Sequence, residues 1–158
     1  MRPQRSQNLK PKKASEFKDK VLEVRRVTRV MAGGKRFSFR ATVVVGDEKG
    51  RVGIGIAKGA DVSAAVEKAK RQGQKEMIRI DLKDGRTVPY DMEAKYGAAR
   101  VRIKPARAGH GLIAGGSARA VLEVAGVKDI SAKILGRTTN KLSNAMATLK
   151  ALKEFEKK

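Results

Sequence analysis

The alternation of apolar and polar residues along residues 37–45 restricts most strongly what this chain can fold into. Side chains of a strand point alternately to opposite faces, so this period of two predicts a strand with one buried face. Residues 21–30 predict a preceding strand, whose imperfect alternation indicates a bulge. After a hairpin turn at residues 46–50, residues 51–56 predict a third strand. One face of the central strand carries Phe37, Phe39, Ala41, Val43 and Val45, and the other carries Ser38, Arg40 and Thr42.

Residues 60–78 follow with apolar residues at helical spacing, and Asp61 and Ser63 are the two candidate N-caps. Three antiparallel strands with a helix across one face make a small α+β unit. Gly53 and Gly55 share one face of the third strand, where the absence of side chains lets a helix approach closely. The spacing in the predicted helix is that of Val62, Val66, Ala69 and Met77.

Asp84-Gly85 and Pro89 predict a domain boundary, after which a second unit follows in the order strand, helix, strand, helix. Its expected elements are a strand over residues 99–104, a glycine-rich loop over 106–116, a helix over 117–125 closed by Gly126, a strand over 127–134 and a helix over 139–155. The expected buried stripe of the last helix is Leu142, Met146, Leu149, Leu152 and Phe155. The predicted divisions are a basic mobile arm over residues 1–19, an N-terminal domain over 20–86 and a C-terminal domain over 87–158.

The charge of the chain indicates a polyanionic partner. Lys and Arg number 37 against 16 Asp and Glu, a formal net charge of +21 over 158 residues. A surface this basic repels itself unless a polyanion neutralises it, and nucleic acid is the usual one. Aromatic residues make up only 4% of the chain, which argues against gripping single strands by stacking. No apolar stretch reaches the roughly 18–20 residues of a membrane span, so we expect no membrane partner.

The sequence offers no constellation for catalysis. It has no cysteine, which excludes disulfides, thiolate metal sites and a cysteine nucleophile. The single histidine, His110, has no Ser, Cys or Asp partner at motif spacing. Gly53-x-Gly55-x-x-x-Gly59 departs from a dinucleotide fingerprint, because its third glycine is one residue late and the acidic residue is missing. We therefore predict no catalytic residue, no metal site and no cofactor.

Three segments suit contact with a phosphate backbone. The hairpin over residues 29–36 presents a flexible basic tip, with a plain solvated hairpin as the alternative. Every outward position of the strand over 100–104 is basic. Because three cations on one strand face repel one another, we expect a phosphate track to face them, with chance placement as the alternative. The loop over 109–117 opens a helix and has N–H groups for a phosphate, with a tight structural turn as the alternative. The candidate RNA-binding residues are Arg25, Arg26, Arg29, Gly33, Gly34, Lys35, Arg36, Arg40, Arg51, Lys58, Arg100, Arg102, Lys104, Arg107 and His110.

Two groups of motifs together resemble one protein family. The segments VTRVMAGGKRFSF (27–39), VVGD (44–47) and GRVGIG (50–55) resemble the N-terminal domain of bacterial small-subunit ribosomal protein S5. The segment IAGGSARAVLEVAGV (113–127) resembles its C-terminal domain. The resemblance implies an α+β fold of two small domains. The first is similar to double-stranded-RNA-binding domains, with three antiparallel strands and one helix, and the second is an α/β sandwich with a left-handed crossover.

The resemblance also implies a function and partners. A member of this family is a structural constituent of the small ribosomal subunit in the cytoplasm, binds ribosomal RNA, joins body and head and contributes to translational accuracy. Its implied partners are small-subunit ribosomal RNA, ribosomal proteins S4 and S8 and the messenger RNA entry region. Gly33-Gly34 corresponds to a tip near the neck, and Gly111 and Arg119 correspond to a protein interface with S4. The alternatives are a free-standing double-stranded-RNA-binding regulator or RNA chaperone, and an enzyme that binds a nucleotide in a glycine-rich loop.

Overall fold

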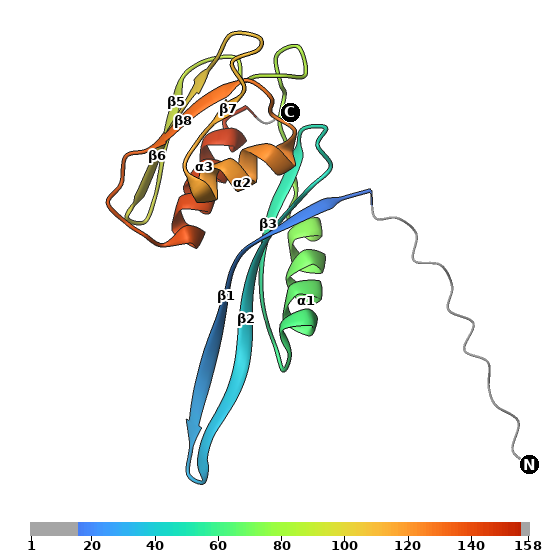
Figure 1. Cartoon of the computed structure of the whole chain (residues 1–158), viewed down its shortest axis with the longest axis vertical. Coiled ribbons are helices and arrows are strands. Elements are labelled where there is room, and N and C mark those ends of the chain that lie inside the picture. The colour runs from blue at the N-terminus through green and yellow to red at the C-terminus, as the bar shows by residue number, and fades with distance from the viewer. Residues whose placement is uncertain (1–15, 156–158) are drawn as a thin grey trace, which may run out of the picture.

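A computed structural model describes residues 16–155, which form two sheets and three helices (Figure 1). The first unit contains β1 (Lys18–Met31), β2 (Gly34–Gly46), β3 (Arg51–Gly59), α1 (Val62–Lys75) and β4 (Ile78–Arg79). The second contains β5 (Met92–Tyr96), β6 (Ala99–Pro105), β7 (Leu112–Ile113), α2 (Gly116–Ala125), β8 (Ile130–Ile134) and α3 (Lys141–Lys153). The helices α2 and α3 lie between the two sheets, and α1 covers the outer face of the first (Figure 1).

The first sheet is antiparallel in the order β1-β2-β3-β4. The register of β1 against β2 shifts between Val21 and Glu23, which confirms the predicted bulge. The short strand β4 was not predicted. The strand β1 begins at Lys18, inside the range predicted as a mobile arm, while residues 1–15 of that arm lie outside the described residues.

The β1–β2 hairpin extends beyond the rest of the sheet. The strand β3 pairs with β2 only between Phe39 and Gly46, so residues 27–38 continue as a two-stranded ribbon (Figure 1). Phe37, predicted to share the buried face, lies on this ribbon and is half exposed. The alternation therefore predicts the buried face correctly only where a helix covers it.

The helix α1 packs closely on the glycine face of β3. A Cβ at Gly55 would overlap the carbonyl oxygen of Ala69, and one at Gly53 would overlap that of Gly73. This confirms that the two glycines admit a helix at close range. Asp61 is the N-cap residue of α1, but its side chain makes no capping hydrogen bond, and Ser63 lies inside the helix.

The opposite face of the first sheet is buried as well, under the second unit. Val44, Val52 and Ile54 belong to one apolar cluster with Leu122 of α2 and Leu152 of α3. Thr42, on the same face, is 3% exposed. The sequence did not predict that the second unit covers this face, and the two units share one hydrophobic core.

The second sheet has the order β5-β6-β8-β7, with β7 and β8 parallel and the other pairs antiparallel. The predicted order of strand, helix, strand, helix was incomplete, since it lacked β5 and β7. The strand β8 begins at Ile130 rather than at residue 127. The helix α2 ends at Gly126, whose φ of 85° is left-handed, as predicted for a glycine C-cap.

The predicted buried stripe of α3 was partly wrong. Leu142, Met146 and Leu149 are only partly buried, whereas the fully buried positions include Ala145, Thr148 and Ala151. Small side chains let α3 approach α2 and the second sheet, so the larger residues lie at the margin. Leu152 and Phe155 are buried as expected. No helix of the described residues is long and apolar enough to cross a membrane.

Candidate nucleic-acid interface

Five of the predicted RNA-binding cations lie on one face of the first sheet. In the β1–β2 register Arg29 is opposite Arg36, and Arg25 is opposite Arg40. In the β2–β3 register Arg40 is opposite Lys58. Residues directly opposite one another share a face, and residues two apart on one strand share it too. We call this set the basic face: Arg25, Arg29, Arg36, Arg40 and Lys58.

The basic face has little internal compensation. Arg25 Nε lies 2.7 Å from Glu23 Oε1, but within residues 16–155 no ion pair joins the other four cations to a carboxylate. Like charges directly opposite on antiparallel strands destabilise the pair. The cations on the ribbon and at its base therefore repel one another, and an external anion would relieve this repulsion.

The other face of the ribbon carries Arg26, Lys35 and the exposed side chains of Val30 and Phe37. The Arg26 guanidinium lies 4.8 Å from the centre of the Phe37 ring, a cation–π contact. Gly33 and Gly34 form the tip, where an added Cβ would meet no atom within 4 Å. The φ of 136° at Gly34 is strained for other residues, so the tip requires glycine there.

The basic residues of β6 are already paired, contrary to the expectation from the sequence. Val101 and Ile103 are fully buried and Arg100, Arg102 and Lys104 point outward, so the alternation is confirmed. Arg100 Nε contacts Glu93 on β5, and Arg102 Nη2 lies 2.7 Å from an Asp91 oxygen. Lys104 Nζ is 3.9 Å from the same carboxylate.

These partners come from Asp91 and the strand β5, which the sequence analysis missed. The hydrogen bond from Arg102 lowers the pKa of the Asp91 carboxyl and raises that of the guanidinium. Glu93 and Asp91 therefore largely relieve the repulsion between the three cations of β6, which was expected to require a phosphate track.

Arg51 is also engaged internally. Its Nε lies 2.6 Å from Asp47 Oδ2 in the β2–β3 turn, and its guanidinium lies 5.6 Å from the centre of the Phe17 ring. Burial raises the pKa of Asp47, but hydrogen bonds from the Arg51 side chain and from the backbone of Lys49 and Arg51 outweigh it and lower the pKa.

The start of the glycine-rich loop is organised by a carboxylate that the sequence analysis did not single out. Asp129 is 2% exposed, and its Oδ1 accepts hydrogen bonds from the N–H groups of Gly109 and Gly111, both at 3.0 Å. Its Oδ2 accepts one from Arg86 Nε at 2.9 Å. The bond from Gly111 and that from Arg86 hold the pKa of this carboxyl below its ordinary value. The sequence feature that could have indicated it is an acidic residue within the predicted strand over residues 127–134.

Arg107, His110 and Arg119 are exposed, and Gly111 is partly exposed. The His110 N–H donates to the carbonyl of Arg107 at 3.1 Å, which closes a turn at the loop tip. Gly109 and Gly111 have φ values of 86° and 78°, left-handed conformations that aim both of their N–H groups at Asp129. The predicted tight structural turn is therefore present in residues 107–111.

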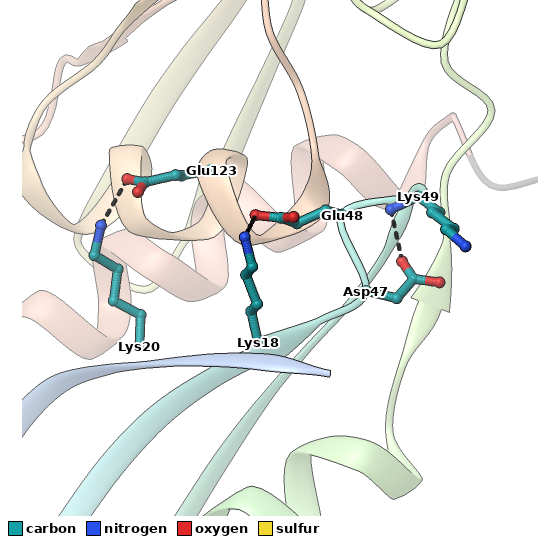
Figure 2. Close-up of polar contacts among 6 residues, drawn as sticks. All are labelled: Lys18, Lys20, Asp47, Glu48, Lys49 and Glu123. Carbon is teal, nitrogen blue, oxygen red and sulfur yellow. Dashed lines mark hydrogen bonds and ion pairs between the residues drawn. The ribbon is translucent and has the colours of Figure 1, made fainter. Parts of the chain in front are cut away.

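The β2–β3 turn holds the two units in a fixed relation. The N–H groups of Glu48 and Gly50 donate to the carbonyls of Val124 and Ala125 at 3.2 and 3.0 Å, so the turn caps the C-terminus of α2. Figure 2 shows two ion pairs beside it, Lys18 with Glu48 at 2.7 Å and Lys20 with Glu123 at 2.6 Å. The same view shows Asp47, whose Oδ1 accepts the Lys49 N–H inside the turn.

Comparison with known proteins finds one family over most of the chain. The family model described as "Ribosomal protein S5, N-terminal domain" matches residues 17–81, and "Ribosomal protein S5, C-terminal domain" matches residues 94–158.

Individual relatives agree with the family models. Small ribosomal subunit protein uS5c of Guillardia theta is 46% identical over 92% of this chain and 85% of its own length. Small ribosomal subunit protein uS5 of Acaryochloris marina is 46% identical over 94% of this chain and 83% of its own length. Small ribosomal subunit protein uS5 of Thermosynechococcus vestitus is 48% identical over 90% of this chain and 82% of its own length. With two domain models matched in order and nearly half of its residues shared with these relatives, the chain belongs to the ribosomal protein S5 family.

Proposed function

We propose that this chain is a structural constituent of the small ribosomal subunit and that it binds ribosomal RNA through the basic face. The observation that carries this proposal is the cross-strand register, which places Arg29 against Arg36 and Arg25 against Arg40. Within the described part of the chain, Glu23 is the only carboxylate paired with these four residues. A phosphate backbone along this face would remove the repulsion between opposed cations.

The mechanism is positional. Cations neutralise phosphates, and the shared core fixes the ribbon relative to the second unit, so RNA bound on the ribbon is held at a set distance from partners of the second unit. We propose that those partners include ribosomal proteins S4 and S8 and the region where messenger RNA enters. Gly111 and Arg119 are the residues we assign to the contact with S4.

This arrangement would join the body and head of the subunit and so influence decoding accuracy. We assign the chain no catalytic role, in keeping with a family of structural proteins, and place it on the ribosome of the cytoplasm or of a plastid.

Co-sedimentation tests the assembly. The full chain should migrate with small ribosomal subunits in near-stoichiometric amount when cell extract is separated on a sucrose gradient. A free-standing RNA-binding regulator or chaperone would remain mostly near the top of the gradient, and that result would contradict the proposal.

A matched pair of triple variants tests the basic face. Changing Arg25, Arg29 and Arg36 to Ala removes three cations, and so does changing Arg100, Arg102 and Lys104 to Ala, so the net charge of the two variants is equal. For Z neutralised phosphates, log K falls against log salt with a slope of about −0.7Z to −0.9Z. We expect the salt slope for small-subunit ribosomal RNA to decrease more in the ribbon variant, because the β6 cations are held by Asp91 and Glu93. Equal slopes would contradict the assignment.

A further inference from the structure

We propose that the N-terminus of α2, with the groove beside it, is a binding site for a phosphate group of RNA. This inference rests on the proposed function, because the phosphate is taken to belong to the RNA that the chain binds. The donors are the backbone N–H groups of Gly116 and Ser117 together with the Ser117 hydroxyl.

The first turn of α2 lacks acceptors of its own. The N-cap is Gly115, which has no side chain to accept a hydrogen bond, and the first turn contains no acidic residue. In α3, by contrast, the Asn140 side chain accepts from the N–H groups of Leu142 and Ser143. The first N–H groups of a helix have no partner within it, and the helix dipole makes that end favourable for an anion.

The Ser117 side chain provides a further donor at this helix end. Ser117 is only 8% exposed, and it lines the groove beside the helix end. Its hydroxyl makes no hydrogen bond to any residue within 16–155. The rest of the residue is buried, but the hydroxyl oxygen is not fully enclosed, so a ligand in the groove can reach it. A phosphate oxygen at the helix end would accept from the hydroxyl and from the backbone together.

The groove is positively charged and open at the helix end. It has a volume of about 390 Å³ and is lined on one side by β1, with Lys20, and on another by Lys141. No Asp or Glu among residues 16–155 lines it. Lys20 already forms an ion pair with Glu123, whereas Lys141 has no ion pair to a described residue. An added Cβ at Gly116 would meet nothing within 4 Å, so a ligand can reach the backbone there.

The two ends of the glycine-rich loop therefore differ. At its start, the N–H groups of Gly109 and Gly111 are satisfied by Asp129, an internal carboxylate. At its end, the donors of Gly116 and Ser117 face a groove into which no carboxylate of the described residues extends. The first part is a structural turn, and only the second is available to an external anion.

A glycine substitution in open space tests the site with little risk to the fold. Gly116→Asp places a carboxylate at the helix N-terminus, where it favours the helix but repels phosphate. Gly116→Ala is the uncharged control at the same position. Gly97→Asp makes the same change of charge in the β5–β6 turn, also in open space. Its left-handed φ is one that Asp tolerates.

The first measurement uses the full ¹⁵N-labelled chain and inorganic phosphate at constant ionic strength, with chloride as the reference salt. We expect saturable amide shifts at Gly116, Ser117 and Ala118 in the natural chain, retained at Ser117 and Ala118 in Gly116→Ala and lost in Gly116→Asp. The melting temperature of Gly116→Asp should not fall. Absence of saturable shifts in the natural chain, or shifts unchanged in Gly116→Asp, would overturn the site.

The second measurement is binding of small-subunit ribosomal RNA across a range of salt. The salt slope should decrease by about one in Gly116→Asp relative to Gly97→Asp, as for the loss of one phosphate contact. Shifts with inorganic phosphate but equal RNA slopes in the two variants would show a site for free phosphate and overturn its assignment to RNA. If the natural chain does not bind the RNA at all, the proposed function fails, whatever the first measurement shows.

Discussion

Asp129 shows how one buried side chain organises a surface loop. Its two oxygens receive two backbone donors from the loop and one guanidinium from Arg86, which lies in the segment between the two units. The backbone of Lys128 and Asp129 also donates to the Arg86 carbonyl. This single carboxylate therefore connects β8, the loop and the inter-unit segment. The neighbouring residues His110 and Gly111 depend on it for their position.

Asp129→Ala should destabilise the protein more than Asp129→Asn. The alanine leaves the donors of Gly109, Gly111 and Arg86 without an acceptor, whereas asparagine keeps one oxygen for the two glycine N–H groups. Thermal unfolding of both variants measures the difference, and loop amide shifts show whether residues 107–111 lose their conformation. Equal melting temperatures for the two variants would contradict this role.

The stability that Asp129 contributes should depend on pH in a defined direction. Its folded pKa is below the ordinary value of 3.8, so the contribution is present above that pH and is lost as the pH falls through the folded pKa. The stability difference between the natural chain and Asp129→Asn should therefore be largest near neutral pH and shrink in strong acid. Denaturant unfolding at a series of pH values measures it. A difference that grows toward acid would have the wrong sign.

At the scale of the elements, the β1–β2 ribbon pairs like charges where a stable hairpin would pair opposite ones. Arg29 faces Arg36 across the strands, beyond the point where β3 supports the sheet. Cross-strand pairs contribute roughly 0.2–1 kcal/mol each, and opposed like charges reverse the sign. The RNA contact proposed for the basic face would offset this loss of stability.

Arg29→Glu should separate stability from binding. It creates an opposite-charge pair with Arg36, so the melting temperature should stay unchanged or rise slightly, while affinity for small-subunit ribosomal RNA should fall. Filter binding and thermal unfolding measure the two effects. Arg71→Glu makes the same change of charge on the exposed face of α1 and is the matched control. If both variants lose affinity equally, the effect is one of net charge and the basic face has no special role.

At the scale of the whole molecule, the two family domains behave as one body. They share a hydrophobic cluster, and the β2–β3 turn of the first caps α2 of the second. At Gly126 the backbones of the two units lie close together, since an added Cβ would overlap the backbone of Glu48. Its φ of 85° is itself unfavourable for other residues.

Gly126→Ala should therefore destabilise both units together, by about 1–3 kcal/mol as for comparable backbone strain. Gly116→Ala, at the open end of the same helix, should change stability far less. Hydrogen exchange of amides in β2 and in α3 reports on each unit separately. We expect a parallel loss of protection in both, and a loss confined to the second unit would refute the single cooperative body.

Local sequence patterns predicted much of this structure. The alternation in β2, the bulge in β1 and the glycine end of α2 all appear where the residues predict them. The strand β5 was missed because it is a short edge strand in which Ala94 is the only buried residue. The stripe of α3 was misjudged because alanines and Thr148, rather than the leucines, occupy the closest approach.

The sequence by itself determined the period of each main element, the positions that require glycine, the excess of positive charge and the resemblance to the S5 family, since each of these depends on residues near one another in the chain. Only the tertiary structure decided which cations are free. Arg100 and Arg102 form ion pairs with Glu93 and Asp91, while Arg29 and Arg36 face one another with no ion pair to a carboxylate of residues 16–155. The tertiary structure also decided that the second unit covers one face of the first sheet and that Asp129 holds the start of the glycine-rich loop. Each depends on strand pairing and packing between distant segments, which local periodicity does not specify.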